Sequence, residues 1–194
     1  MKKPWHRLLT KSLIESGDIL GCSGSSFQSD FINVVTYGIP RYHLSHLMII
    51  CDGLIFESTT QSDLPCALRG IKFNGTQAHY IGSRVASYQG SVWHYPLSKK
   101  LRSAETKKLY HYLVANLGKP YDSLGATRSG GKIWSIINRN LHAESHSALF
   151  CSEWVAAALQ HIERFDTRST EWSPNALIRE LTSRGTLTKP RRLK

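Results

Sequence analysis

Residues 46–59 read HLMIICDGLIFEST, two apolar runs separated by Asp52 and Gly53. A two-residue type I′ turn needs positive φ at both central positions, and Asp-Gly is among the pairs that adopt it most readily. The stretch therefore predicts a β-hairpin in which Cys51 faces Leu54 and the numbers of paired residues sum to 105. We take this hairpin as the fixed point of the fold.

The hairpin register also brings polar residues together. It places His46 opposite Thr59 and Met48 opposite Glu57. Because residues two apart on a strand share a face, His46, Glu57 and Thr59 point to the same side. Glu57 is diagonal to His46, about 7–8 Å away between backbones, which a long side chain can span. A carboxylate beside an imidazole holds a general base in one tautomer, although a histidine at a strand start is also a common structural residue.

Outside the hairpin, short strands and helices follow one another without an internal repeat. Ser173 and Pro174 open the last helix and Gly185 closes it. We expect a strand ending at Leu20, a flexible loop over 21–26, strands at 71–73 and 92–95, and helices at 27–37, 103–117, 133–141, 149–162 and 175–183.

Length and composition favour a single folded domain. The chain has 194 residues, of which 41% are hydrophobic and 10% aromatic, enough for a core. This excludes an intrinsically disordered chain and a coiled coil, and there is no apolar run of the roughly 18 residues that a membrane-spanning helix needs. We expect an N-terminal extension over 1–12, one domain over 13–186, and a basic C-terminal tail over 187–194, disordered over 189–194.

The chain is strongly basic. It carries 25 Lys and Arg against 14 Asp and Glu, a net charge of +11, and the basic residues gather at 99–108 and 189–194. This balance favours an anionic partner such as an acidic wall polymer, a membrane surface or nucleic acid, but a basic protein with no such partner fits equally. We expect no obligate nucleic acid.

Four cysteines occur without CxxC spacing: Cys22, Cys51, Cys66 and Cys151. The N-terminus lacks the apolar region of an export signal, so we expect free thiols in a reducing, cytoplasmic compartment. Cys151 is predicted at or near the start of an apolar helix, where exposed amides and the macrodipole favour a thiolate. A buried structural cysteine is the alternative. The other three fit a nucleophile less well.

Other chemistries lack their motifs. The chain has no GxSxG, no GxGxxG and no complete Walker loop. The HAESH segment at 142–146 offers two histidines, but not in the HExxH order and without a third ligand. We therefore expect neither a metal nor a cofactor.

Several short motifs occur in a recognisable order. They are GDIL at 17–20, SHLMI at 45–49, the strand with Glu57, GKPYD at 118–122, FCSEWV at 150–155 and a closing SPNAL at 173–177. Over about residues 15–180 this order resembles the permuted papain-like family, the circularly permuted NlpC-type branch that includes YiiX/YaeF-like amidases and is related to lecithin:retinol acyltransferases.

The resemblance implies an α+β, circularly permuted papain-like fold, in which a small antiparallel sheet packs on helices that include the one bearing the catalytic cysteine. Matched by position, Cys151 is the nucleophile, His46 the general base and Glu57 the orienting residue, with Thr59 as the alternative to Glu57. Tyr121 matches a position near the cleft.

The expected function is a cysteine hydrolase, an amidase or peptidase that cleaves an amide bond through an acyl-enzyme. Its substrate would be a peptide, cell-wall or acyl compound. The backbone amide of Cys151 would donate to the oxyanion. Two alternatives stay open: a thiol acyltransferase or lipid (thio)esterase, and a catalytically silent module that binds polyanions. A phage or bacterial origin would fit the basic tail.

Overall fold

The computed structural model describes residues 14–24, 44–59, 62–119, 143–167 and 172–194, with backbone alone over 143–150. The helices predicted at 27–37 and 133–141, the HAESH segment's histidines and Tyr121 fall outside the residues or side chains described.

The described residues form a mixed α+β fold around one six-stranded antiparallel sheet, which confirms the α+β class. The strand order is β4-β3-β2-β1-β5-β6. The strands are β1 (Ile19–Gly24), β2 (His46–Cys51), β3 (Leu54–Thr59), β4 (Gly75–Tyr80), β5 (Gly90–Tyr95) and β6 (Arg191–Arg192). The helices are α2 (Ile81–Ser87), α3 (Ser103–Ala115), α6 (Ala143–His161) and α7 (Pro174–Ser183).

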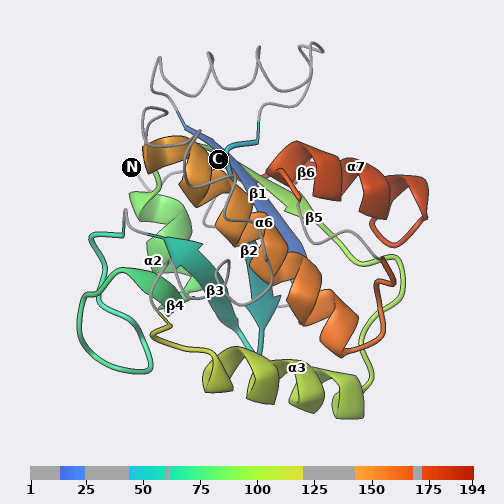
Figure 1. Cartoon of the computed structure of the whole chain (residues 1–194), viewed down its shortest axis with the longest axis horizontal. Helices are drawn as coiled ribbons and strands as arrows, with labels where there is room; N and C mark the ends of the chain where they lie inside the picture. Colours follow the sequence, from blue (N-terminus) through green and yellow to red (C-terminus); the bar gives the residue numbers. More distant parts are fainter. Residues whose placement is uncertain (1–13, 25–43, 60–61, 120–142, 168–171) are drawn as a thin grey trace, which may run out of the picture.

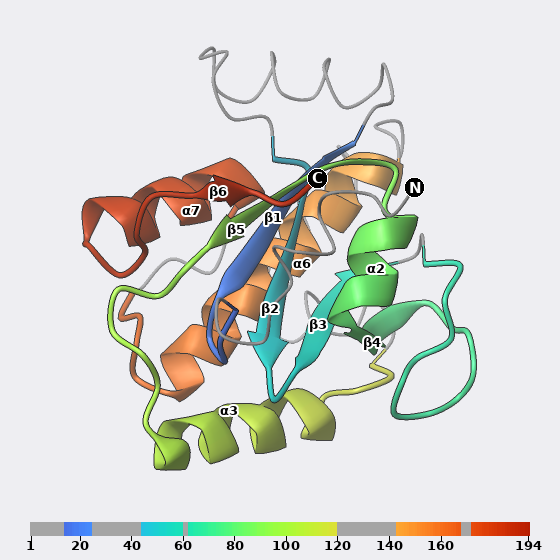
Figure 2. The same cartoon turned by 180° about the vertical axis from the view of Figure 1, so that it is seen from behind.

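Helices cover both faces of the sheet. Figure 1 shows α6 lying across one face, with α7 beside it and α3 beyond the hairpin turn. Seen from behind, α2 lies on the opposite side, next to β3 and β4 (Figure 2). The larger core cluster fills the space under α6, and a smaller cluster that includes Val85 of α2 fills the other side. No described helix is both long and apolar enough to cross a membrane.

The predicted hairpin is confirmed. Asp52 has φ of 50° and Gly53 has φ of 75°, as a type I′ turn requires. The paired residues are Ile49–Phe56, Ile50–Ile55 and Cys51–Leu54, which match the predicted sum. Alternation along the strands then sends Leu47, Ile49 and Phe56 into the larger cluster and Met48, Ile50 and Ile55 into the smaller one.

The strand predicted at 71–73 is wrong. Those residues are in no strand, and the sheet instead continues through β4, whose sequence GTQAHY carries little of the β-branched and aromatic signal. The loop predicted over 21–26 is wrong up to Gly24, because β1 runs to that residue. A Cβ at Gly21 would lie 2.9 Å from the side chains of Leu44 and Tyr95, so this glycine serves close packing within a strand.

Helices α3 and α7 lie close to their predicted positions. In α7, the Ser173 hydroxyl accepts from the amide of Ala176 at 3.3 Å, Pro174 is the first helical residue, and Gly185 has φ of 69°. In α3, the N-cap is Arg102, and the Glu105 carboxylate accepts from the Arg102 amide at 2.8 Å.

The C-terminal tail is ordered, so the prediction of a disordered tail is wrong. Arg191 and Arg192 pair with β5 as the edge strand β6. Leu193 is 8% exposed and packs in the smaller core cluster, while the ammonium of Lys194 donates to the carbonyls of Ala86, at 2.9 Å, and Tyr88. One apolar residue among the basic ones anchors the segment.

Candidate active site

The three residues predicted to carry the chemistry lie together. His46 Nε2 is 2.7 Å from Oε2 of Glu57. The side chain of His46 also hydrogen-bonds to Cys151, and the backbone amide of Leu47 donates to the Cys151 sulfur at 3.3 Å. A thiol, an imidazole and a carboxylate thus form one connected chain of contacts.

The sulfur reaches this position because the ladder between β2 and β3 stops short. Its pairing ends at Ile49–Phe56. In an antiparallel pair the amides of alternate residues face the same neighbour, so the Leu47 amide, like that of Ile49, points toward β3. It donates to Sγ of Cys151, on the helix that packs across β2 and β3. His46, one residue earlier, is thereby next to the sulfur as well.

His46 is set up to hold a proton. The ring is nearly buried, with 12% of the side chain exposed. Burial by itself would lower the pKa of His46. The charge on the Cys151 sulfur and its hydrogen bond, followed by the bond to Glu57, outweigh burial and raise the pKa to about 9. The contacts therefore favour a protonated ring on His46.

Glu57 is a fully buried carboxylate held ionised by its neighbours. Oε1 accepts from Nε of Arg84 at 2.5 Å, and Oε2 accepts from Nη2 at 2.9 Å. His79 Nε2 lies 3.4 Å from Oε1. Burial would raise the pKa of Glu57, but the hydrogen bond from His46 and the charge of Arg84 lower it to about 2. Glu57 is thus an acceptor for His46 throughout the neutral pH range.

The predicted placement of Cys151 at a helix start is wrong. The helix α6 begins at Ala143, eight residues earlier, so Cys151 lies in its interior. An interior amide bonds to the carbonyl four residues before it, which removes the Cys151 amide as an oxyanion donor. The sulfur-bearing residue has 0% of its surface exposed. The backbone amide aimed at the sulfur is that of Leu47.

Thr59 was the alternative to Glu57 as the residue that orients His46. It lies at the end of β3, opposite Gly75, and its carbonyl accepts from the side chain of Gln77 at 3.4 Å. The atom next to Nε2 of His46 is Oε2 of Glu57. Geometry thus favours Glu57 as the orienting residue.

All four cysteines are described, and each is a buried thiol. Cys22 pairs with His46 across β1 and β2, a proximity that the sequence analysis missed. Burial first, and then the charge of Glu57, raise the pKa of Cys22 well above its usual value. Burial also raises the pKa of Cys51 to about 12. Neither thiol is prepared for ionisation.

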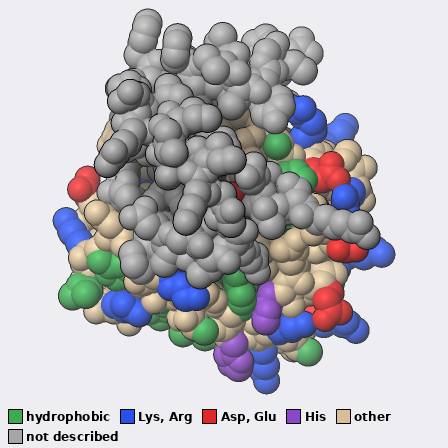
Figure 3. Space-filling view, in the orientation of Figure 1, with side chains coloured by type: hydrophobic (Ala, Val, Ile, Leu, Met, Phe, Trp, Pro, Cys, Tyr) green, Lys and Arg blue, Asp and Glu red, His purple; other side chains and the backbone are tan. Residues whose placement is uncertain are grey.

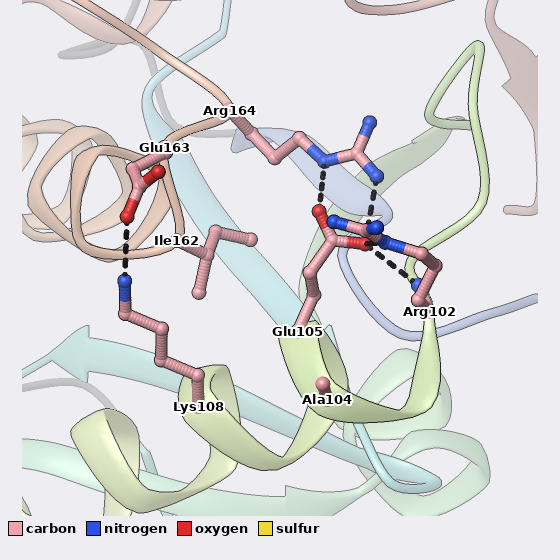
Figure 4. A pocket seen from close by; sticks show the side chains of 7 residues that line it. All are labelled: Arg102, Ala104, Glu105, Lys108, Ile162, Glu163 and Arg164. Carbon is pink, nitrogen blue, oxygen red and sulfur yellow. Dashed lines mark hydrogen bonds and ion pairs between the residues drawn. The ribbon is translucent and has the colours of Figure 1, made fainter.

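A surface pocket of about 500 Å3 lies between α3 and the chain that follows α6. Figure 4 shows that its charged groups pair with one another, since Glu105 accepts from Arg102 and Arg164, and Lys108 contacts Glu163 at 2.9 Å. None of the predicted site residues lines it.

Part of the positive charge in the basic segment at 99–108 is paired with carboxylates. Lys100 forms an ion pair with Glu15, in addition to the pairs made by Arg102 and Lys108. Figure 3 shows Lys and Arg side chains around much of the edge of this face, with most of its Asp and Glu side chains beside them on the right.

Sequence reasoning missed Arg84 and His79. Arg84 occurs in the segment IGSRVAS, which has no pattern to separate a buried arginine from an exposed one. Gln77 and His79 are two residues apart on β4 and therefore lie on the same face of the sheet as Glu57. This polar face can be recognised only once the pairing of β3 with β4 is known. Within the described residues, no group of His, Cys, Asp and Glu is arranged to hold a metal ion.

No protein-family model matches the chain, and no curated protein matches it in sequence. The likeness to the permuted papain-like family therefore rests on its short motifs.

Proposed function

We propose that this protein is a cysteine hydrolase that cleaves an amide bond, with Cys151 as nucleophile, His46 as general base and acid, and Glu57 as the residue that orients His46. The observation that carries the proposal is one imidazole hydrogen-bonded both to a thiol and to a buried carboxylate. This is the arrangement that activates a cysteine nucleophile.

In the proposed reaction, His46 holds the thiol proton while the Cys151 sulfur attacks the substrate carbonyl carbon. The electron pair of the C=O bond moves to oxygen and returns as the C–N bond breaks, and the imidazolium gives its proton to the departing amine. His46 then removes a proton from water, which attacks the thioester and releases the acid with the thiol restored.

Access to the sulfur is part of the proposal. Because Cys151 has no exposed surface, a carbonyl reaches it only when the surrounding atoms move apart. The rate at which a small electrophile modifies the sulfur measures that opening together with the ionisation of the thiol.

The choice of an amide bond is supported by the motifs, which resemble those of permuted papain-like amidases. An acyl acceptor other than water would make the same acyl-enzyme chemistry a transferase reaction, and product analysis distinguishes the two. Binding of polyanions is supported only by the +11 charge, part of which is paired with carboxylates at 99–108.

The proposal is tested with iodoacetamide and with p-nitrophenyl acetate, followed by mass spectrometry of the peptides. We expect Cys151 to be alkylated faster than Cys22, Cys51 and Cys66 near neutral pH, and to carry the acetyl group. The variant Cys151→Ala should lose both reactions, whereas Cys51→Ala should retain them. Equal reactivity of all four thiols would refute the proposal.

A further inference from the structure

The carboxylate of Glu57, which contacts His46, is also held by Arg84. Arg84 reaches from α2 and contacts both oxygens of Glu57, at 2.5 and 2.9 Å, with only 6% of its side chain exposed. A bidentate guanidinium fixes the plane of a carboxylate as well as its charge. Oε2 is therefore held where it meets Nε2 of His46 at 2.7 Å.

Arg84 is in turn fixed by its surroundings. Its guanidinium lies 5.5 Å from the ring centre of Tyr88. The carbonyls at the end of α2 are bound by Lys194, and Leu193 packs in the same cluster as Val85. The ordered tail thus braces the helix that presents Arg84.

Charge balance shows why the arginine matters. The titratable groups around Glu57 come from every element packed there: Cys22, His46, His79, Arg84, Tyr88 and Cys151. With a thiolate on Cys151 and an imidazolium on His46, the charges of Glu57 and Arg84 bring the buried total to zero. Without Arg84, the total is −1, and a buried site relieves an unbalanced charge by taking up a proton. A proton on either Glu57 or Cys151 ends the reactive pairing.

We propose that Arg84 is a positioning residue of the site, which holds Glu57 as an oriented anion so that His46 stays aligned for proton transfer with Cys151. The inference rests on the proposed function and adds to it a fourth member that never touches the substrate. Arg84 acts through Glu57, and this predicts a specific pattern of rescue.

The test measures the rate of Cys151 alkylation by iodoacetamide from pH 5.5 to 9 in the full chain, with thermal unfolding as the check on folding. We expect Arg84→Met to slow alkylation at pH 7 by about tenfold or more, part of the 10²–10⁴ that acid–base catalysis contributes. Arg84→Lys keeps the positive charge but cannot contact both carboxylate oxygens as a guanidinium does. Its alkylation rate should lie between those of the wild type and Arg84→Met. In the double variant Glu57→Gln with Arg84→Met the buried charges balance again, so alkylation should be faster than in Arg84→Met alone.

The ring of His46 gives a second readout. Its 15N chemical shifts should show both nitrogens protonated at pH 7 in the wild type and a neutral ring in Arg84→Met. A purely structural arginine would lower the unfolding temperature of all three variants and leave the pH profile and the ring shifts unchanged, which would overturn the inference. Slow alkylation of Cys151 in the wild type would instead refute the proposed function.

Discussion

Two histidine–carboxylate pairs among the described residues share the same short distance from Nε2 to a carboxylate oxygen. His46 of β2 meets Glu57 of β3, and His94 of β5 meets Asp18, just before β1, in both cases with Nε2 2.7 Å from a carboxylate oxygen. All four residues are buried or nearly so. Neither the residue types nor the distance separates one pair from the other.

The two pairs differ in what surrounds them. Asp18 also accepts from the backbone amides of Glu15 and Leu97, at 2.9 Å each, so it ties chain segments together. Nδ1 of His94 lies 3.4 Å from a guanidinium nitrogen of Arg191, an acceptor position facing a cation.

By contrast, the side chain of His46 has a thiol as its second partner, and its carboxylate, Glu57, contacts the side chains of Arg84 and His79. Under the proposed function, the second partner of the imidazole, more than the carboxylate, would distinguish a reactive pair from a structural one.

The largest expected effect separates the two histidines by reactivity. His46→Ala should slow alkylation of Cys151 near pH 7 by roughly 10²–10⁴, because the group that holds the thiol proton is gone. His94→Ala should leave that rate within about twofold and lower the unfolding temperature instead, since Asp18 loses a buried partner. Kinetic alkylation and thermal melts on both variants measure this. A similar loss of reactivity in the two variants would remove the distinction.

The carboxylates should separate by stability. Glu57→Gln leaves the buried charge of Arg84 without its counter-ion, which typically costs about 3–5 kcal/mol of unfolding free energy. Asp18→Asn keeps only one of the two oxygens that accept from the amides of Glu15 and Leu97, so one amide loses its acceptor, and the change should cost about 1–3 kcal/mol. Urea unfolding of both variants measures the two losses of unfolding free energy. A larger loss in Asp18→Asn than in Glu57→Gln would contradict this prediction.

The pH dependence of stability should report the reactive pair. The pKa of His46 is raised in the folded chain from its usual 6.5 to about 9, so its stabilisation is complete below pH 6.5 and is lost as pH rises toward 9. The pKa of Glu57 is lowered to about 2, so its stabilisation is lost only as pH falls from about 4.5 toward 2.

Unfolding free energies measured from pH 5 to 10 should therefore decline above pH 6.5 as His46 loses its proton in the folded chain. His46→Gln is the matched control and should lack this decline. An equal decline in the control would assign it to other groups.

The smallest expected effect concerns the cation beside His94. The 3.4 Å contact from Arg191 is long for a hydrogen bond and its donor residue is exposed, so Arg191→Ala should cost less than about 1 kcal/mol. It should leave the alkylation of Cys151 unchanged. If it slowed alkylation as much as Arg84→Met does, the two pairs would be coupled and the comparison between them would not hold.

Local signals in the sequence were sufficient for the hairpin and its register, because the Asp52-Gly53 turn and the alternation around it are properties of neighbouring residues. That register correctly placed His46 within reach of Glu57. The last helix was predicted for the same reason, from Ser173, Pro174 and Gly185.

Features that depend on distant segments could not be predicted. The strand β4 is weak by composition and exists through its pairing with β3. Arg84 gains its role from a carboxylate 27 residues away, and the place of Cys151 depends on where a long helix begins. The basic tail resembled a disordered end because the burial of Leu193 requires a groove that forms only in the folded chain.

The bond from the Leu47 amide to the Cys151 sulfur gives the protein a built-in reporter. An amide proton that points at sulfur changes its NMR resonance when that sulfur gains a charge or a covalent group. A single peak in a 15N–1H spectrum would then follow the thiol through ionisation and acylation, without a dye or a label on the substrate.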